Sequence, residues 1–275
     1  LIIKQGLQDE EYKEKQKILV PLSNPDTMKN LLEFASFIQR EDNKNPVYAL
    51  TIFTDKNEIR NRIHNNVERI NRIIKSLHSD VIFETSSRID NSVSNGIIRA
   101  ADEFISTTII IGWNKTKTPF NRLFGNLLNN LLNKTERMVI VVKTPSSFRM
   151  VKRIHMFCPE RAQFEKGFHL WLNTFVYLVK KFQLITNIHC KSIKTLKAIQ
   201  HHTDKTGTSK YFAFQENEPA QHISDNIKNS SEDLLIFVHS RKKTISYNRS
   251  FENGMNKSMS THNNNNVVII YPEQY

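Results

Sequence analysis

Two pairs of histidine and cysteine are the side chains whose types point most directly to metal chemistry. His155 and Cys158 stand three positions apart, and His189 and Cys190 are adjacent. Imidazole and thiolate are the ligands that zinc prefers in proteins. Both pairs fall in short apolar runs typical of strands, where residues one or three positions apart point to opposite faces of a sheet. We therefore expect buried cysteines with partly exposed histidines, and the sequence predicts no metal site.

The spacing of the glycines excludes several classes of nucleotide chemistry. No two glycines lie closer together than Gly112 and Gly125, so the G-x-G-x-x-G dinucleotide fingerprint and the P-loop are both absent from the sequence. The G-x-S-x-G elbow of many hydrolases and the H-E-x-x-H motif of zinc proteases are absent as well. We therefore expect no catalytic residues and no enzymatic activity.

The elements that must position any site alternate regularly between strand and helix. A short apolar run such as Ile18 to Leu22 ends in a turn, and apolar residues at helical spacing follow it. This alternation favours a parallel sheet with helices on both faces, whose ligands bind beyond the carboxyl ends of the strands where the strand order reverses. In the first half, the expected strands are residues 18–22, 47–53, 81–84, 108–111 and 138–142, and the expected helices are residues 28–38, 57–77, 93–105 and 120–132.

The second half repeats this alternation after about 130 residues, which indicates a duplicated domain. Residues 246–266 are rich in Ser, Asn and Met and favour a weak helix or a mobile loop. The sequence thus predicts an α/β fold of two tandem, doubly wound, five-stranded parallel sheets. The other expected strands are residues 156–159, 184–190, 211–214, 234–238 and 267–271, and the expected helices are residues 164–182 and 223–227. The expected organisation is a lead-in segment over residues 1–17, a first domain over residues 18–147 and a second, degenerate domain over residues 148–275, with the boundary near residues 145–147.

Composition and charge limit the class of protein, its compartment and its partners. The 275-residue chain is 39% hydrophobic and 24% charged with a formal net charge of +12, which is typical of a folded, soluble protein. No apolar run approaches the ~18 residues of a membrane span, and two cysteines without a secretory leader favour the cytosol. The basic residues are spread along the chain, so we expect no nucleic-acid partner. Because the sequence begins at Leu1 rather than Met, we expect it to be a piece of a longer chain.

Three segments carry a resemblance to a known family. They are residues 109–115 (IIIGWNK), 124–127 (FGNL) and 138–142 (MVIVV). With the order of the elements, they resemble the universal stress protein family, which implies a fold like that of the adenine nucleotide alpha hydrolases. The nucleotide signature of that family, after the fourth strand, is G-x2-G-x9-G-[ST]. Gly112 holds its first position and Lys115 stands where its second Gly is expected. Gly125 holds the third Gly position, and Asn126 replaces the final Ser or Thr.

The resemblance implies a site for ATP or another adenine nucleotide in the first domain. The two glycines of the signature would let backbone N–H groups approach phosphates, and Gly125 with Asn126 would open the following helix toward the anion. Lys115 would either crowd this turn or pair with a phosphate as a point charge. Ser23 takes the place of the Asp with which the family contacts the nucleotide, and main-chain groups near Ile52 would contact adenine. The alternative is that the two glycines only shape a strand end and a helix start.

The second domain does not keep this signature. His239 occupies the place of Gly112, and Glu252 with Asn253 stands roughly where the glycine pair is expected. The resemblance therefore implies that a nucleotide binds in the first domain only.

A tandem pair of such domains, with a non-Met start and a positive net charge, resembles the cytoplasmic tail of some bacterial cation/proton antiporters. This implies a non-enzymatic regulatory domain at the cytoplasmic face of the inner membrane. Its expected partners are the transmembrane antiporter domain of the same chain and a second copy in a homodimer. One alternative is a stand-alone cytoplasmic universal stress protein that binds nucleotides or other proteins, and a further one is slow nucleotide hydrolysis in the first domain.

Overall fold

The structure is a computed structural model of the chain and describes residues 16–54, 59–113, 120–217, 227 and 229–274. It divides into two compact units, Leu1–Val139 and Ile140–Tyr275. The lead-in segment and the boundary near residues 145–147 stay predictions.

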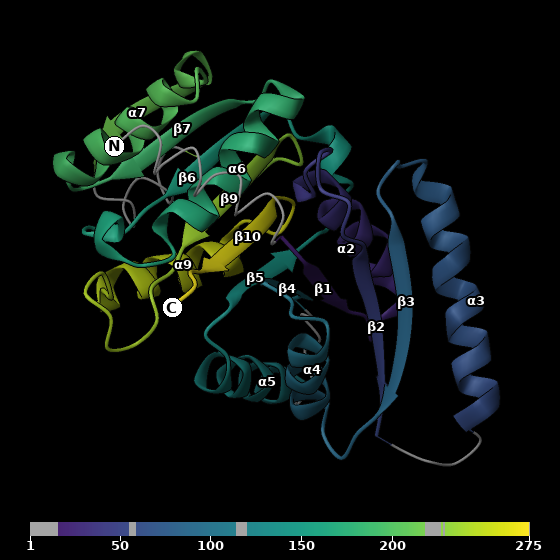
Figure 1. Cartoon of the computed structure of the whole chain (residues 1–275). Helices are drawn as coiled ribbons and strands as arrows, with labels where there is room; N and C mark the ends of the chain where they lie inside the picture. Colours follow the sequence, from purple (N-terminus) through teal and green to yellow (C-terminus); the bar gives the residue numbers. More distant parts are fainter. Residues whose placement is uncertain (1–15, 55–58, 114–119, 218–226, 228, 275) are drawn as a thin grey trace. The chain divides into compact units, whose positions relative to one another are not determined.

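The first unit is a parallel sheet covered by helices on both faces. Its strands follow the order β3-β2-β1-β4-β5, in which the chain winds outward in both directions from β1. Helices α2 and α3 lie on one face and α4 and α5 on the other (Figure 1). The strands are β1 (Ile18–Pro21), β2 (Val47–Phe53), β3 (Phe83–Ile89), β4 (Thr108–Gly112) and β5 (Met138–Lys143), the last of which crosses the division between the units. The helices are α2 (Pro25–Ile38), α3 (Ile59–Leu77), α4 (Val93–Glu103) and α5 (Phe120–Lys134).

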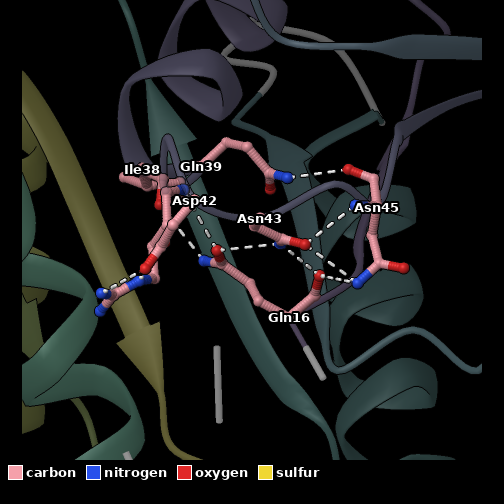
Figure 2. A network of polar contacts seen from close by, with 7 residues as sticks. Gln16, Ile38, Gln39, Asp42, Asn43 and Asn45 are labelled. Carbon is pink, nitrogen blue, oxygen red and sulfur yellow. Dashed lines mark hydrogen bonds and ion pairs between the residues drawn. The ribbon is translucent and has the colours of Figure 1, made fainter. Parts of the chain in front are cut away.

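The amino end of β1 is fixed by a polar network around Gln16, a residue that is only 1% exposed (Figure 2). The side-chain amide of Gln16 donates to the Ile38 carbonyl at 3.2 Å and accepts from the Arg40 backbone N–H at 3.3 Å. Asn43 donates from Nδ2 to the Gln16 carbonyl at 2.7 Å, and its Oδ1 accepts from the Asn45 backbone N–H at 2.9 Å. These bonds pair the Ile38 carbonyl, the Arg40 N–H and the Gln16 carbonyl where α2 ends and the chain turns toward β2.

The second unit repeats the strand order of the first. Its strands run β10-β9-β6-β7-β8, with parallel pairing throughout. Helices α6 and α7 lie on one face of this sheet and α9 on the other (Figure 1). The strands are β6 (Arg153–Phe157), β7 (Ile185–Cys190), β8 (Phe212–Glu216), β9 (Asp233–Val238) and β10 (Asn266–Tyr271). The helices are α6 (Phe168–Phe182), α7 (Ile193–Lys205) and α9 (Arg249–Thr261), and the short 3-10 helices are η1 (Phe148–Met150), η2 (Ala162–Phe164) and η3 (Ser209–Tyr211). The predicted α/β class with parallel strands is confirmed.

Several elements differ from the predictions. Helix α7 was not expected, because its buried face consists only of Leu196, Ile199 and two threonines among lysines and histidines. Strand β3 extends to Ile89 rather than ending near residue 84, since its polar and half-exposed residues hide the strand pattern. The stretch over residues 246–266 contains a helix, α9, which Asn248 caps. The short helix expected over residues 223–227 lies outside the described residues, apart from Ile227.

Candidate functional site

A cavity of about 450 Å³ opens at the carboxyl ends of β1, β2 and β4 in the first unit. This is the point where the strand order reverses, between β1 and β4, and ligands of open α/β sheets bind at such points. Its floor is apolar and buried, and consists of Leu22, Leu50, Ile97 and Ile111. The cavity is therefore large enough for a small organic ligand, and its floor favours an apolar face of that ligand.

The polar groups of the cavity are hydroxyls and amides. Ser23 follows β1, Ser94 lies in the first turn of α4, and Asn126 and Asn130 project from α5. Ser23 and both asparagines are exposed, whereas Ser94 is 7% exposed. Among the described residues that line the cavity, none carries an ionisable side chain. Such a lining can hold a flat, apolar group whose edge makes hydrogen bonds.

The structure brings four of the six predicted site residues together. Ser23, Ile52, Gly112 and Asn126 all line the cavity, although they come from four different elements or their ends. Lys115 lies outside the described residues. The contact of these residues with a nucleotide stays a prediction.

Gly125 does not line the cavity, and the expectation that it opens a helix is wrong. Helix α5 begins at Phe120, so Gly125 lies in its second turn rather than at its positive end. A Cβ built at this position meets nothing within 4 Å. Helix α5 begins where the apolar periodicity of the sequence predicts, at Phe120, and a single glycine does not interrupt a helix.

The absence of a side chain at Gly112 has a packing reason. A Cβ at this position would lie 2.9 Å from Cδ1 of Leu31, which packs from α2 onto the end of β4. Gly112 therefore shapes a strand end, as the alternative interpretation of the sequence proposed, and it also lines the cavity.

Helix α4 forms one wall of the cavity, and its contribution was not predicted. Gly96 lets α4 approach β2 closely, because a Cβ there would lie 3.0 Å from Cδ1 of Ile52. The buried Asp90 carboxylate, just after β3, accepts from Arg99 of α4 at 3.2 Å, and Ser92 caps the helix by accepting from the Asn95 backbone N–H at 3.2 Å. A glycine among the apolar positions of α4 was the sequence signal for this close approach.

In the second unit, buried side chains of the protein itself pack at the equivalent end of the sheet, as far as the described residues show. His239 directly follows β9, as Gly112 ends β4, and is 6% exposed. Its ring lies 5.1 Å from that of Tyr271 and 6.4 Å from that of Tyr247, between centroids. Burial lowers the pKa of His239, an effect that the charge of Glu252 partly opposes.

The loop after His239 is also held by internal contacts. The Glu165 carboxylate accepts from the backbone N–H of Ser246 at 3.0 Å and from its hydroxyl at 2.6 Å. The Ser246 hydroxyl also contacts that of Ser240. Tyr247 donates from its hydroxyl to Oε2 of Glu252 at 2.8 Å. A carboxylate of the chain thus takes the hydrogen bonds that an anionic ligand would need.

The two histidine and cysteine pairs lie on or directly after neighbouring strands of the second unit: His155 on β6, Cys158 directly after it, and His189 and Cys190 on β7. Nδ1 of His155 on β6 lies 3.2 Å from Nε2 of His189 on β7, so the two rings share a hydrogen bond. His189 is fully buried rather than partly exposed, because Phe157 stacks on it at 4.8 Å. Both cysteines are buried, and burial raises the pKa of both thiols. No group of three potential metal ligands occurs among the described residues.

The fold and the site together define an α/β domain with a cavity at its topological switch point. Residues 15–143 match the model of the universal stress protein family, so the first half carries a domain of that family. No curated protein matches the chain by sequence.

Solved structures with the same fold match nearly the whole chain. The chain is similar to the cytoplasmic domain of a prokaryotic cation chloride cotransporter, with a TM-score of 0.62 and 10% identity over 94% of this chain and 96% of that one. It is similar to a universal stress protein from Archaeoglobus fulgidus, with a TM-score of 0.58 and 13% identity over 95% and 98% of the two chains. A protein of unknown function from Pseudomonas aeruginosa matches with a TM-score of 0.55 and 11% identity over 96% and 95%. At these identities the likeness shows the fold, which both halves of the chain share.

None of the helices that the structure describes is both long enough and apolar enough to cross a membrane.

Proposed function

We propose that the protein is a non-enzymatic regulatory domain that senses an adenine nucleotide or nucleoside in the cavity of its first unit. The observation that carries this proposal is the cavity itself, of about 450 Å³, at the switch point of a universal stress protein domain. Its apolar floor suits the faces of a purine, and Ser23, Ser94, Asn126 and Asn130 suit the edges of the purine and ribose hydroxyls.

The absence of ionisable side chains among the described lining residues supports a sensing role rather than catalysis. Hydrolysis of a nucleotide needs a group that positions or deprotonates water, and hydroxyls and amides do this poorly at neutral pH. We expect incubation with ATP to release no more phosphate than buffer alone.

The proposed setting is the cytoplasmic side of a membrane cation transporter, an antiporter in the narrower form of the proposal. The similarity in fold to the cytoplasmic domain of a cation chloride cotransporter, over nearly the whole length of both chains, supports this setting. The proposed partners are the transmembrane domain of the same chain and a second copy of the protein. Sequencing upstream of Leu1 tests this part: membrane spans in the same frame are expected, and an initiator Met directly before Leu1 would contradict it.

Calorimetric titration with ATP, ADP, AMP and adenosine tests the ligand. Val93 is 37% exposed at the mouth of the cavity, so Val93→Trp should fill the entrance without disturbing the core. We expect this variant to weaken binding at least about tenfold, because a bulky ring removes the space for the ligand.

The matched control is Ile82→Trp, at a position that is 60% exposed and does not line the cavity. It should bind like the wild-type protein. Equal binding by the Val93 variant would place the ligand elsewhere, and no binding of any of the four compounds to the wild-type protein would refute the adenine specificity.

A further inference from the structure

One end of the second unit carries exposed apolar side chains among cations. The short helix η2, which follows β6, and the first turn of α7, which follows β7, meet at the carboxyl end of the sheet. The hydroxyl of Thr195 joins them, because it accepts from the backbone N–H of Arg161 at 3.1 Å and donates to Oε1 of Gln163 at 2.7 Å. The two segments therefore form one surface.

Two large apolar side chains of this surface face water. Phe164 is 65% exposed and Ile193 is 50% exposed. Arg161, Lys194 and Lys197 are exposed on the same two segments, with both lysines within one helical turn of Ile193. We call these five residues the α7 patch. An aromatic and an aliphatic side chain bordered by cations is the combination with which proteins bind the interface of an anionic bilayer.

The stability of the fold does not account for these cations. Arg161 has a φ of 66°, in the left-handed region that glycine and asparagine adopt most easily. The first turn of α7 contains Lys194 and no acidic residue, although the positive end of a helix favours acidic side chains. At both positions the chain gives up local stability and gains positive charge.

The net charge of the second unit, which surrounds the α7 patch, is also positive. Residues 140–275 contain 19 Lys and Arg against 10 Asp and Glu, so this unit holds +9 of the net +12 of the chain. Glu160, Glu165 and Glu216 are acidic residues at this end of the sheet. Glu160 and Glu216 lie close enough to Cys190 to raise the pKa of its thiol, and Glu165 accepts hydrogen bonds from Ser246. The three cations of the patch and the neighbouring Lys191 outnumber them. The surface is thus complementary to an anionic partner.

We propose that the α7 patch docks the second unit onto the anionic lipid headgroups of a membrane surface. Phe164 and Ile193 enter the headgroup region, and the three cations pair with lipid phosphates and carboxylates. A nucleic acid would use the cations but would gain little from an exposed isoleucine, so the apolar pair favours lipid. This inference does not depend on nucleotide binding in the first unit.

Co-sedimentation with vesicles tests the proposal on the full chain. Vesicles of phosphatidylcholine mixed with phosphatidylserine should bind the protein, and vesicles of phosphatidylcholine alone should bind it weakly. Lys194→Gln with Lys197→Gln should reduce binding to the mixed vesicles by about an order of magnitude or more, since each lysine near the surface contributes attraction. Added salt should weaken binding of the wild-type protein, because these charge contacts are screened.

The matched control is Lys29→Gln with Lys75→Gln, two exposed lysines of the first unit whose loss changes the net charge equally. We expect at most about a twofold effect from it, as for general surface charge. Phe164→Ser with Ile193→Ser should lower the binding that remains at high salt, and thermal unfolding checks that each variant folds.

Equal losses in the patch and control variants would overturn the proposal, because net charge alone would then explain binding. Absence of binding to the mixed vesicles would overturn it too. If a DNA duplex binds with the same dependence on Lys194 and Lys197 while the vesicles do not, the partner is a nucleic acid and lipid docking is refuted.

Discussion

The buried His239 makes the stability of the second unit depend on pH. Burial lowers its pKa below the ordinary value of 6.5, so the unfolded chain takes up a proton at a higher pH than the folded protein does. Its contribution to stability is complete above about pH 6.5 and is lost as the pH falls through that value, because protonation then favours the unfolded chain.

We predict that His239→Phe reduces the loss of unfolding free energy between about pH 7.5 and pH 5.5. The slope of the unfolding free energy against pH should fall by at most about 1.4 kcal/mol per pH unit, which corresponds to the uptake of one proton on unfolding. Urea unfolding at both pH values measures this loss of unfolding free energy. The control Gln200→Ala, on the exposed face of α7, should keep the wild-type slope. An unchanged slope in the Phe variant would show that His239 titrates normally in the folded protein.

The two glycines of the family signature should respond to substitution in opposite directions. Gly125 lies inside α5 with open space around it, so Gly125→Ala should stabilise the protein by about 0.5–1 kcal/mol through helix propensity. Gly112→Ala should destabilise it by about 1 kcal/mol or more, because the new Cβ forces the Leu31 side chain to move.

Urea unfolding and nucleotide titration of both variants separate packing from binding at these glycines. If Gly125→Ala stabilises the protein and leaves nucleotide affinity unchanged, Gly125 takes no part in the site. A destabilising effect of Gly125→Ala as large as that of Gly112→Ala would contradict the position of Gly125 inside α5.

The sequence predicts those residues of the candidate site that lie at or directly after the ends of strands or within the family signature. Ser23, Ile52, Gly112 and Asn126 were found in this way, since the ends of parallel strands must meet at one edge of the sheet. The apolar floor and the wall from α4 were not found. Residues such as Ile97 read as ordinary core, because their position beside a cavity depends on how closely α4 approaches β2.

At the scale of elements, the loop between α2 and β2 depends on a single side chain. Gln16 stands in the segment that the sequence analysis treated as a lead-in, yet its amide bonds both the Ile38 carbonyl and the Arg40 N–H where α2 ends. Nothing in the local pattern marks it, since its partners lie more than 20 positions away in the sequence.

We predict that Gln16→Ala lowers the unfolding free energy by about 1–3 kcal/mol, because it removes the hydrogen bonds to the Ile38 carbonyl and the Arg40 N–H where α2 ends. Gln16→Glu should cost at least as much, since a carboxylate oxygen would face the Ile38 carbonyl. Chemical denaturation measures both changes, with Gln200→Ala on the exposed face of α7 as the control. A cost for Gln16→Ala no greater than for Gln200→Ala would mean that the network of Figure 2 adds no stability.

The elements themselves were predictable where apolar periodicity was strong. All of the predicted strands exist, because runs such as Val139 to Val142 are buried on both faces and contain little else. The failures share one cause. Strand β3 and helix α7 bury few apolar residues, so the sequence shows no clear apolar pattern for them. Tertiary packing and caps such as Ser192 determine where they form.

At the scale of the whole molecule, the two copies of the duplicated fold differ at the carboxyl ends of their strands. Both units wind their strands in the same order. The first has an open cavity beside Gly112, whereas in the described part of the second His239 packs against Tyr271 at the equivalent end and Glu165 holds the following loop. Duplication thus left one unit with space for a ligand and the other with internal contacts in its place.

We therefore predict one adenine ligand per chain. In the second unit, a ligand would have to displace the Ser246 hydrogen bonds to Glu165 and separate buried aromatic rings, which opposes binding there. Titration calorimetry should give a stoichiometry of one, and Val93→Trp should weaken binding at that one site at least about tenfold. Tyr247→Phe, which deletes the hydroxyl that Glu252 accepts from in the second unit, should leave the affinity unchanged. Two ligands per chain, or a loss of affinity in the Tyr247 variant, would show that the second unit also forms a site and that its internal contacts open for a ligand.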